Sequence, residues 1–307
     1  MNTTDNNMST EDNNEGSTLS KCANCGKEGS NLNSCNKCKM VTYCNAACKK
    51  KHRSKHKKKC DRHVSEMYEE ALFKQPPQRE DCPICFLRLP SLHSGSKYNA
   101  CCGKIICSGC THAVTKMDGN VDDLCPFCRA PAAADAVQMV MKRMEVDDAI
   151  AMDQLGRWYQ NGDRGFPQNA DKALDFFHRA GELGHVHSYH SIGCAYFHGD
   201  GVERDEKKAK QYWELAAIGG DVSARYYLGI LEERAGNMSR ALMHYMIAAE
   251  CGVNGSLKEI RKLYTSGHAT KDDFAKALRA HQKYVDGIKS DQRDKATAFN
   301  REKYRYY

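Results

Sequence analysis

The chain has 307 residues, of which 41% are hydrophobic and 28% charged, with a formal net charge of +7 and 17 cysteines. This length indicates two or three compact units rather than one large core. No apolar run reaches membrane-spanning length, and the first twenty residues lack the basic start and apolar stretch of a secretory signal. We therefore expect an intracellular protein, cytoplasmic or nuclear, whose paired cysteines bind metal rather than form disulfides.

The cysteines divide the chain, since fifteen of them lie between Cys22 and Cys128 and only Cys194 and Cys251 follow. We predict a multidomain protein: two small zinc cross-brace modules followed by an all-α repeat solenoid. The predicted parts are a disordered tail at 1–20, a zinc module at 21–60, a linker helix at 61–79 that proline ends, a second zinc module at 80–131, the solenoid at 132–290 and a C-terminal tail at 291–307.

The first module contains eight candidate zinc ligands in closely spaced pairs. Such spacing places each pair on a tight knuckle or on successive turns of a helix, as tetrahedral zinc requires. Forty residues cannot otherwise pack a stable core, so the metal supplies the folding energy. The ligands are Cys22, Cys25, Cys35, Cys38, Cys44, Cys48, His56 and Cys60. His52 competes with His56, but only His56 lies one helical turn before Cys60.

This spacing, with Tyr43 just before Cys44, resembles the MYND zinc finger over residues 21–60. The resemblance implies interleaved sites and a peptide-binding role. It assigns one zinc to Cys22, Cys25, Cys44 and Cys48, and the other to Cys35, Cys38, His56 and Cys60. Lys49 and His52 replace the glutamine and tryptophan of the typical pattern, so a preference for proline-rich partners does not follow.

The run at residues 49–59 contains eight lysines or arginines. It could contact nucleic-acid phosphates or act as a nuclear import signal, or it could be a solvated helix face. Residues 21–60 stay positive even when two Zn²⁺ and seven thiolates are counted. No aromatic platform for stacking bases accompanies the lysines, so nucleic-acid binding is the least favoured of the functions considered.

The second module reads CPICFLRLP, ACCGKIICSGC and CPFCRAP, and resembles a RING finger of the rarer all-cysteine form over about fifty residues. The resemblance assigns one zinc to Cys82, Cys85, Cys107 and Cys110, and the other to Cys101, Cys102, Cys125 and Cys128. Lys104 occupies the position of the usual histidine ligand, so two adjacent cysteines must supply both ligands. His112 is the alternative to one of them.

RING fingers commonly recruit a ubiquitin-conjugating enzyme, and the resemblance assigns this contact to Ile84, Pro126 and Arg129. Arg129 would bridge the enzyme and its ubiquitin, so that no catalytic side chain is required. The alternative is that Ile84 and Pro126 only pack the zinc knuckles while Arg129 is solvated. Catalytic zinc is disfavoured, because every predicted site fills four protein ligands.

Beyond residue 148 the sequence repeats with a period of 36 or 37 residues. Gly156, Gly193 and Gly229 recur in the first helices, where they would allow close helix approach. The second helices carry Ala173, Phe177, Ala180 and Gly184, then Ala209, Trp213, Ala216 and Gly220, then Ala241, Tyr245, Ala248 and Gly252. Offsets of four, seven and eleven mark one helix face that ends in a glycine cap.

These motifs resemble Sel-1-like repeats, relatives of tetratricopeptide repeats, over roughly residues 148–288. A degenerate copy around Ser256, Ile260, Tyr264 and Gly267 would cap the array. The aromatic residues of the repeats, Cys194 and Cys251 are expected to pack between helices. The resemblance implies protein binding by the concave face.

The combined interpretation is a protein-interaction adaptor with four Zn²⁺, in which the solenoid holds a client protein and the fingers recruit partners. The leading alternative is a RING-type ubiquitin ligase that modifies the solenoid-bound client. A third is nucleic-acid binding through the basic finger. No membrane association is expected.

Overall fold

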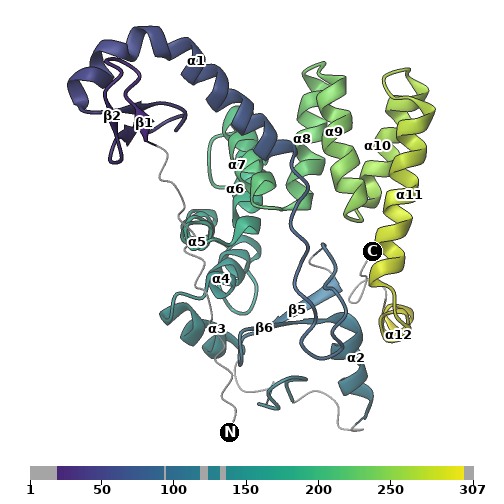
Figure 1. Ribbon diagram of the computed structural model, residues 1–307. Coiled ribbons are helices and arrows are strands. Elements are labelled where there is room, and N and C mark those ends of the chain that lie inside the picture. The colour runs from purple at the N-terminus through teal and green to yellow at the C-terminus, as the bar shows by residue number, and fades with distance from the viewer. Residues whose placement is uncertain (1–18, 93–94, 118–123, 132–135, 301–307) are drawn as a thin grey trace, which may run out of the picture. The chain divides into compact units, whose positions relative to one another are not determined.

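The computed structural model describes residues 19–92, 95–117, 124–131 and 136–300, with only the backbone at 115–117. The chain divides into two compact units, residues 1–71 and 72–307 (Figure 1). Residues 1–18 of the predicted disordered tail lie outside the described residues, whereas Ser20 belongs to a strand. No described helix is long and apolar enough to cross a membrane.

The first unit consists of two short hairpins and most of one long helix. Strand β1 (Ser20–Lys21) pairs with β2 (Glu28–Gly29), and β3 (Asn33–Ser34) pairs with β4 (Thr42–Tyr43), both antiparallel. Helix α1 (Ala46–Phe73) follows, and the Asn45 carboxamide accepts a hydrogen bond from its first turn. The buried core comprises Cys22, Cys35, Cys38, Tyr43 and Cys60.

Helix α1 corrects the prediction of a separate linker helix at 61–79. The helix that carries the last predicted zinc ligands runs without a break to Phe73, because no glycine or proline interrupts the segment after Cys60. It ends before Pro76, as a proline stop requires. The buried Arg225 guanidinium binds this end by donating to the carbonyls of Leu72 and Lys74.

The second unit begins with the RING-like module. Strands β5 (Ser96–Asn99) and β6 (Lys104–Cys107) form an antiparallel pair, and helix α2 (Ser108–Met117) follows directly. Ile106 and Leu89 are buried beside four of the cysteines and form the module's small core. Cysteine thus contributes most of the core here, as it does in the first unit.

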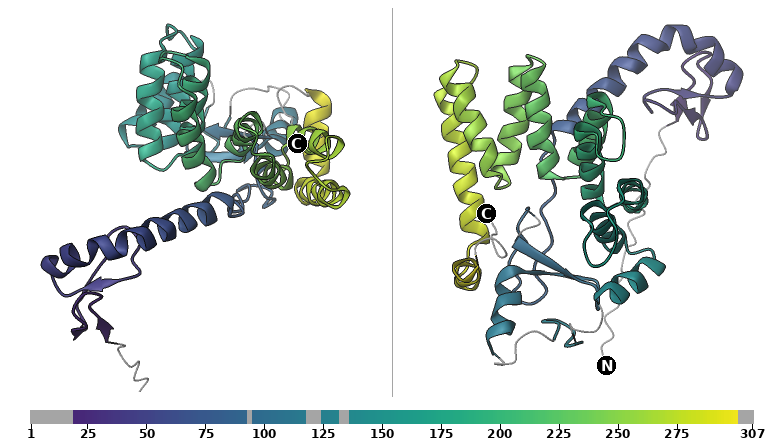
Figure 2. Two further views of the ribbon diagram at one scale, coloured as in Figure 1. Left: turned by 90° about the horizontal axis from the view of Figure 1, so that it is seen from above. Right: turned by 180° about the vertical axis from the view of Figure 1, so that it is seen from behind.

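The rest of the second unit is helical. Its helices are α3 (Ala136–Glu145), α4 (Ala149–Asn161), α5 (Ala170–Glu182), α6 (Val186–His198), α7 (Glu206–Ile218), α8 (Val222–Arg234), α9 (Met238–Glu250), α10 (Asn254–Thr265), α11 (Lys271–Ile288) and α12 (Asp291–Phe299). Figure 2 shows α4 to α11 as successive helix pairs. The predicted solenoid of repeated helix pairs is confirmed.

Each repeat is closed by a glycine in one helix against an aromatic ring in the next. A Cβ atom added at any of these glycines would lie 2.4–2.6 Å from the ring, closer than atoms can approach. The pairs are Gly156 with Phe177, Gly193 with Trp213, and Gly229 with Tyr245. The three rings are at most 1% exposed, which confirms that they are core residues. Gly184, Gly220 and Gly252 have positive φ, as predicted for helix caps.

The predicted C-terminal tail at 291–307 is wrong for residues 291–299, which form α12; residues 301–307 lie outside the described residues. This helix packs against α2, where a Cβ atom at Gly109 would lie 2.9 Å from the Arg293 backbone nitrogen. Arg293 is fully buried and donates to the carbonyls of Ile288, Leu87 and Arg88. Helix α12 is held by contacts with residues about two hundred positions earlier in the chain, and no local sequence pattern predicts such contacts.

Candidate metal centres

Sixteen side chains gather into four groups, each with four sulfur or nitrogen atoms within 4.8 Å of one another. The groups are Cys22, Cys25, Cys44 and Cys48; Cys35, Cys38, His56 and Cys60; Cys82, Cys85, Cys107 and Cys110; and Cys101, Cys102, Cys125 and Cys128. These are the four sets that the two resemblances imply. A tetrahedron of sulfur atoms about 2.3 Å from a central zinc has edges of about 3.8 Å.

Distances within the groups fit that tetrahedron. The Sγ atom of Cys44 lies 3.7 Å from that of Cys25 and 3.5 Å from that of Cys48. The Sγ atoms of Cys35 and Cys60 lie 3.9 Å apart. In the second module Cys85 and Cys107 lie 3.7 Å apart. Soft thiolates in tetrahedral sets of four suit Zn²⁺ and leave no open position for a substrate. The arrangement is that of structural metal sites.

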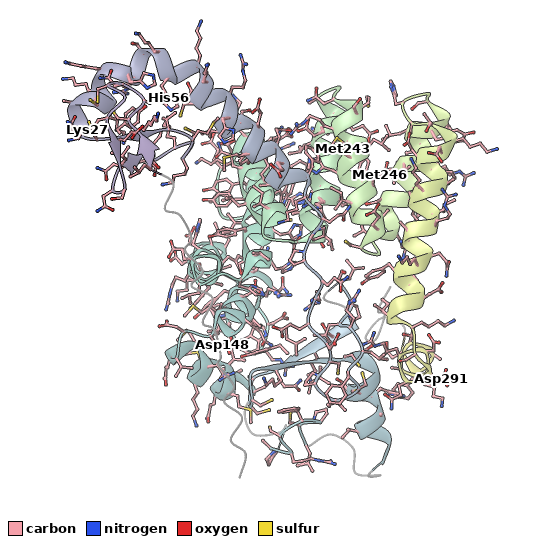
Figure 3. The ribbon with its side chains drawn as sticks, viewed as in Figure 1. Lys27, His56, Asp148, Met243, Met246 and Asp291 are labelled. Atoms are coloured by element: carbon pink, nitrogen blue, oxygen red, sulfur yellow. The ribbon has the colours of Figure 1, made fainter. Side chains whose placement is uncertain are left out.

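The competition between His52 and His56 is decided by Tyr43. The Tyr43 hydroxyl lies 3.1 Å from Nδ1 of His52, so this ring is part of the polar contact that orients the buried tyrosine. The neighbouring His56 (Figure 3) places Nε2 3.3 Å from the Cys38 Sγ atom, inside the second group. Hence His56, not His52, stands with the cysteines.

Backbone N–H groups prepare two thiols of the first finger as thiolates. Hydrogen bonds from the Cys44 and then the Cys25 backbone lower the pKa of Cys22 to about 6. The backbone of Cys38 is the main cause that lowers the pKa of Cys35 to about 6. A hydrogen bond from a fixed N–H group favours the charged thiolate, which is the form that binds metal.

The adjacent pair Cys101 and Cys102 reaches one group because it lies in the tight β5–β6 turn. The N–H groups of Cys102 and Gly103 both donate to the Asn99 carbonyl, and Gly103 has positive φ. His112 belongs to none of the four groups. Its buried ring instead packs 4.9 Å from the Phe299 ring of α12.

The three residues that the RING resemblance assigns to partner contact all lie on the zinc knuckles. Ile84 is half-buried against the module's core, Pro126 is half-buried, and Arg129 is exposed with φ of +61°. Phe86 is 77% exposed and also has positive φ. The sequence analysis does not single out Phe86, which directly follows the candidate ligand Cys85.

The RING-like module is attached to the solenoid at both ends of the array. The Tyr98 hydroxyl of β5 donates to the Asp148 carboxylate (labelled in Figure 3), which also caps α4. At the other end, the Ser91 N–H donates to the Tyr284 hydroxyl of α11. Arg293 adds its bonds to the Leu87 and Arg88 carbonyls.

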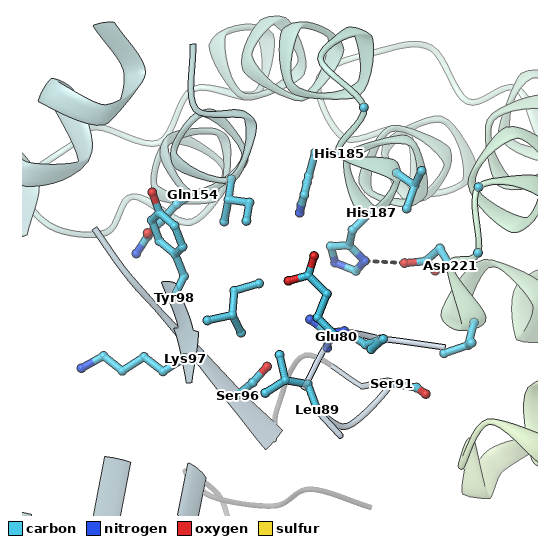
Figure 4. A pocket seen from close by; sticks show the side chains of 18 of the residues that line it. Glu80, Leu89, Ser91, Ser96, Lys97, Tyr98, Gln154, His185, His187 and Asp221 are labelled. Carbon is cyan, nitrogen blue, oxygen red and sulfur yellow. Dashed lines mark hydrogen bonds and ion pairs between the residues drawn. The ribbon is translucent and has the colours of Figure 1, made fainter. Parts of the chain in front are cut away.

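A cavity of about 740 Å³ lies between this module and α4, α6 and α8 (Figure 4). His187 on its wall lies 2.8 Å from the Asp221 carboxylate, the N-cap of α8. The Glu80 carboxylate, from the segment before the module, points toward His185 and His187 in Figure 4. Because these residues come together only in the folded chain, no sequence motif marks the cavity.

The repeats beside the cavity contain buried charges with displaced pKa values. Burial alone would raise the pKa of the Asp221 carboxyl, but the hydrogen bond from His187, the charges of His187 and His190 and the Ala224 N–H together hold this pKa well below its ordinary value. Asp153 is fully buried, receives bonds from Arg157 and Ser188, and also has a lowered pKa. Burial lowers the pKa of His190 to about 4.

The sequence model of the MYND finger matches residues 22–60. That of the Sel1 repeat matches residues 149–185, 186–221 and 222–253. The chain therefore contains a MYND finger and three Sel1 repeats, and the second cysteine module stands between them.

Several of the curated proteins that this chain resembles bear ubiquitin-ligase names. The chain is 31% identical over 108 residues to the ERAD-associated E3 ubiquitin-protein ligase component HRD3B of Arabidopsis thaliana, a match that covers 35% of this chain and 17% of that protein. It is 36% identical over 66 residues to the E3 ubiquitin-protein ligase DA2 of the same plant, covering 22% and 16%. The chain thus spans about a sixth of each relative.

A solved Sel1 repeat protein from Oxalobacter formigenes shares 28% identity with the chain, with a TM-score of 0.44, over 49% of this chain and 63% of that one.

Proposed function

We propose that this protein is a zinc-stabilised adaptor in which the Sel1 solenoid holds a client protein while the two zinc modules, with two Zn²⁺ each, recruit partners. The observation that carries the proposal is the cavity between the RING-like module and helices α4, α6 and α8, which we call the junction cavity. The module and the repeats line it together. A client in this cavity would touch both, so that the partner of the module is brought to the client. The tetrahedral cysteine sets support structural rather than catalytic metal.

The adaptor proposal is tested by filling the cavity. Ile150 and Gln154 are half-buried residues of α4 that line it, and an arginine at either position would occupy its volume. We expect Gln154→Arg to abolish recovery of the clients that crosslink to the parent chain, with zinc content unchanged. Asp171→Arg, at an exposed position of α5, is the matched control. Equal recovery by both variants would refute a client in this cavity.

The second candidate is a ubiquitin ligase with the same arrangement. The observation that favours it is Arg129, exposed on the last knuckle and held in the left-handed region, with Ile84 on the first knuckle. A guanidinium with five donors can contact two protein surfaces at once, whereas an apolar knuckle residue contributes burial. The ligase-associated names of HRD3B and DA2 point the same way.

Autoubiquitination with a panel of conjugating enzymes decides between adaptor and ligase. We expect Arg129→Ala to keep zinc and enzyme binding but to suppress ubiquitin discharge, because the residue lies outside the ligand sets. Ile84→Ala should weaken enzyme docking instead. If the parent chain neither binds nor discharges any conjugating enzyme, the ligase proposal fails and the adaptor proposal stands alone.

A further inference from the structure

Each of the first two Sel1 repeats carries a stacked pair of aromatic rings with a lysine over it. In the first repeat the rings of Tyr159 and Phe176 lie 5.7 Å apart, and the Lys172 ammonium lies 5.2 Å from the centre of the Tyr159 ring. The second repeat has a ring distance of 5.6 Å and a cation distance of 5.0 Å. Its equivalent residues are Tyr196, Tyr212 and Lys208. Because ring faces attract both rings and cations, this group of three is a repeated packing unit.

The third repeat lacks the first ring of this unit. Three positions after its glycine, where the other two repeats have tyrosine, it has Glu232. This residue is 1% exposed, and its carboxylate pairs with Lys210 and Arg240. The position of the second ring is held by His244, and that of the lysine by Arg240. The third repeat therefore has a cation and a second ring, but no first ring of its own.

Phe73, at the end of α1, supplies the missing ring. Its ring lies 4.6 Å from that of His244, at an angle of 38°, and the Arg240 guanidinium lies 5.0 Å from its centre. The preceding residue, Leu72, is fully buried in a cluster with residues of α7 and α8, among them Trp213. Leu72 and Phe73 belong to the same compact unit as the repeats. A segment from outside the array thus completes the third repeat.

The third repeat also contains an arginine that binds the main chain of this segment. Arg225 is 1% exposed, and its guanidinium donates to the carbonyls of Leu72, Lys74 and Ala217. The last carbonyls of a helix have no partner within the helix and carry partial negative charge, so a guanidinium suits them whatever the side chains are. The other two repeats have methionine and tyrosine at this position, four residues before the glycine. The recognition of a helix end is therefore specific to the third repeat.

The present occupant does not satisfy every polar group around it. His244 is fully buried, yet neither of its ring nitrogens has a hydrogen-bond partner among the residues that the structure describes. Phe73 beside it offers no hydrogen-bonding group and is only half-buried. Release of the segment would let water reach this imidazole, which offsets part of the cost of losing the other contacts. A short segment held in this way can be exchanged for another.

We infer that the third repeat is a recognition site for a leucine-phenylalanine pair at the end of a helix, and that residues 72–75 occupy it as a tethered ligand. The partner that fits is a protein segment of the same chemistry, with leucine beside Trp213, phenylalanine against His244 and two free carbonyls for Arg225. Such a partner displaces residues 72–75 and releases the end of α1. None of these four residues lines the junction cavity, so the inference does not depend on the client proposed there.

The test is binding of a labelled peptide with the sequence of residues 64–77 to the full-length chain. Combining Leu72→Ala with Phe73→Ala removes both anchoring side chains and leaves every predicted zinc ligand in place. This double variant should bind the peptide at least about tenfold more tightly than the parent, whose own segment competes at an effective concentration of about 1 mM. A peptide that carries Phe73→Ala should bind the double variant at least about tenfold more weakly. Lys74→Ala, which changes an exposed side chain and keeps the carbonyl, should behave as the parent.

Hydrogen exchange of the parent chain gives a second result that does not require the double variant to fold. Millimolar peptide should speed exchange at the amide groups of residues 72–75 at least about twofold, because the peptide replaces them in the site. Unchanged exchange would overturn the inference. Equal affinity of the parent and the double variant would also overturn it, as would absence of binding by a double variant that keeps its helical content. In each of these cases residues 72–75 are a fixed part of the fold, and the proposed adaptor and ligase functions are unaffected.

Discussion

The first zinc finger and the Sel1 solenoid reach a buried core by different means. Four of the five buried core residues of the finger are cysteines, so its interior consists mainly of the predicted metal ligands. The solenoid buries alanines, leucines and aromatic rings that interlock with glycines on neighbouring helices. The stability of the finger is therefore linked to metal, whereas that of the solenoid depends on steric fit.

Metal removal should produce the largest difference in stability between the zinc modules and the solenoid. We expect four Zn²⁺ per chain, and we expect a chelator to unfold residues 21–128 while the solenoid stays helical. Trp213 is fully buried among the repeats, so its fluorescence should barely change as zinc is lost, whereas Trp158 lines the cavity beside the RING-like module and should report the unfolding of that module. Elemental analysis and fluorescence check this. A zinc content near two would show that one module is a metal-free remnant.

Mild acid should destabilise the solenoid through its buried histidines. Burial lowers the pKa of His190 to about 4 and that of His244 to about 3, from an ordinary 6.5. The unfolded chain therefore binds protons at higher pH than the folded chain, so this stability is complete above pH 6.5 and is lost as pH falls toward 4 and then 3. The loss is roughly 3 kcal/mol or more per group.

The measurement is urea unfolding of the parent chain, followed by tryptophan fluorescence between pH 8 and pH 4. His190→Gln and His244→Gln should each flatten the pH dependence, because the variants cannot be protonated there. His198→Gln, at an exposed position of α6, should keep the parent's slope. An equal slope in all four chains would mean that the buried rings are not the source of the acid sensitivity.

Steric fit in the solenoid is tested by adding one methyl group. A Cβ atom at Gly193 would lie 2.5 Å from the Trp213 indole, so Gly193→Ala should cost about 1–3 kcal/mol of the free energy of unfolding through overpacking. Gly287 in α11 has no atom within 4 Å of an added Cβ atom. Gly287→Ala should therefore stabilise the helix by up to about 1 kcal/mol. Thermal unfolding of both variants checks the contrast; zinc content should stay constant.

What the sequence predicts well in both regions is local or periodic. Cysteine pairs with two or three residues between them must share a knuckle or successive turns of a helix, and glycines at a period of 36 or 37 residues must meet equivalent partners. The sequence did not predict features that depend on contacts between residues far apart in the chain. Arg293 holds α12 through the carbonyls of Leu87 and Arg88, and the cavity joins Glu80 to His187 and Asp221.

Backbone conformation is a second property that the sequence does not predict. Phe86 is one apolar residue beside a cysteine pair in the sequence, and its exposure and positive φ become visible only when the chain is folded. The sequence analysis also did not predict that α1 continues beyond Cys60 as a single helix. Composition marked residues 61–79 as a separate part, but the helix needs no new start when no breaker interrupts it.

The smallest effect is expected for the basic face of α1. Lys57 and Lys58 are exposed, and neither forms an ion pair with any residue that the structure describes. Replacing both by glutamine should change the free energy of unfolding by less than about 0.5 kcal/mol, as for most surface substitutions.

If the finger is a protein-binding module, the parent chain should bind duplex DNA only weakly at physiological salt. Each phosphate contact would contribute about −0.9 to the slope of log affinity against log salt, so DNA recognition by these lysines would make the double variant's slope shallower by about 2. Lys276→Gln on α11 is the control outside the finger. Suppose that the parent binds DNA tightly and that only the finger variant has a shallower slope of log affinity against log salt. Nucleic-acid recognition would then be the favoured function of this finger.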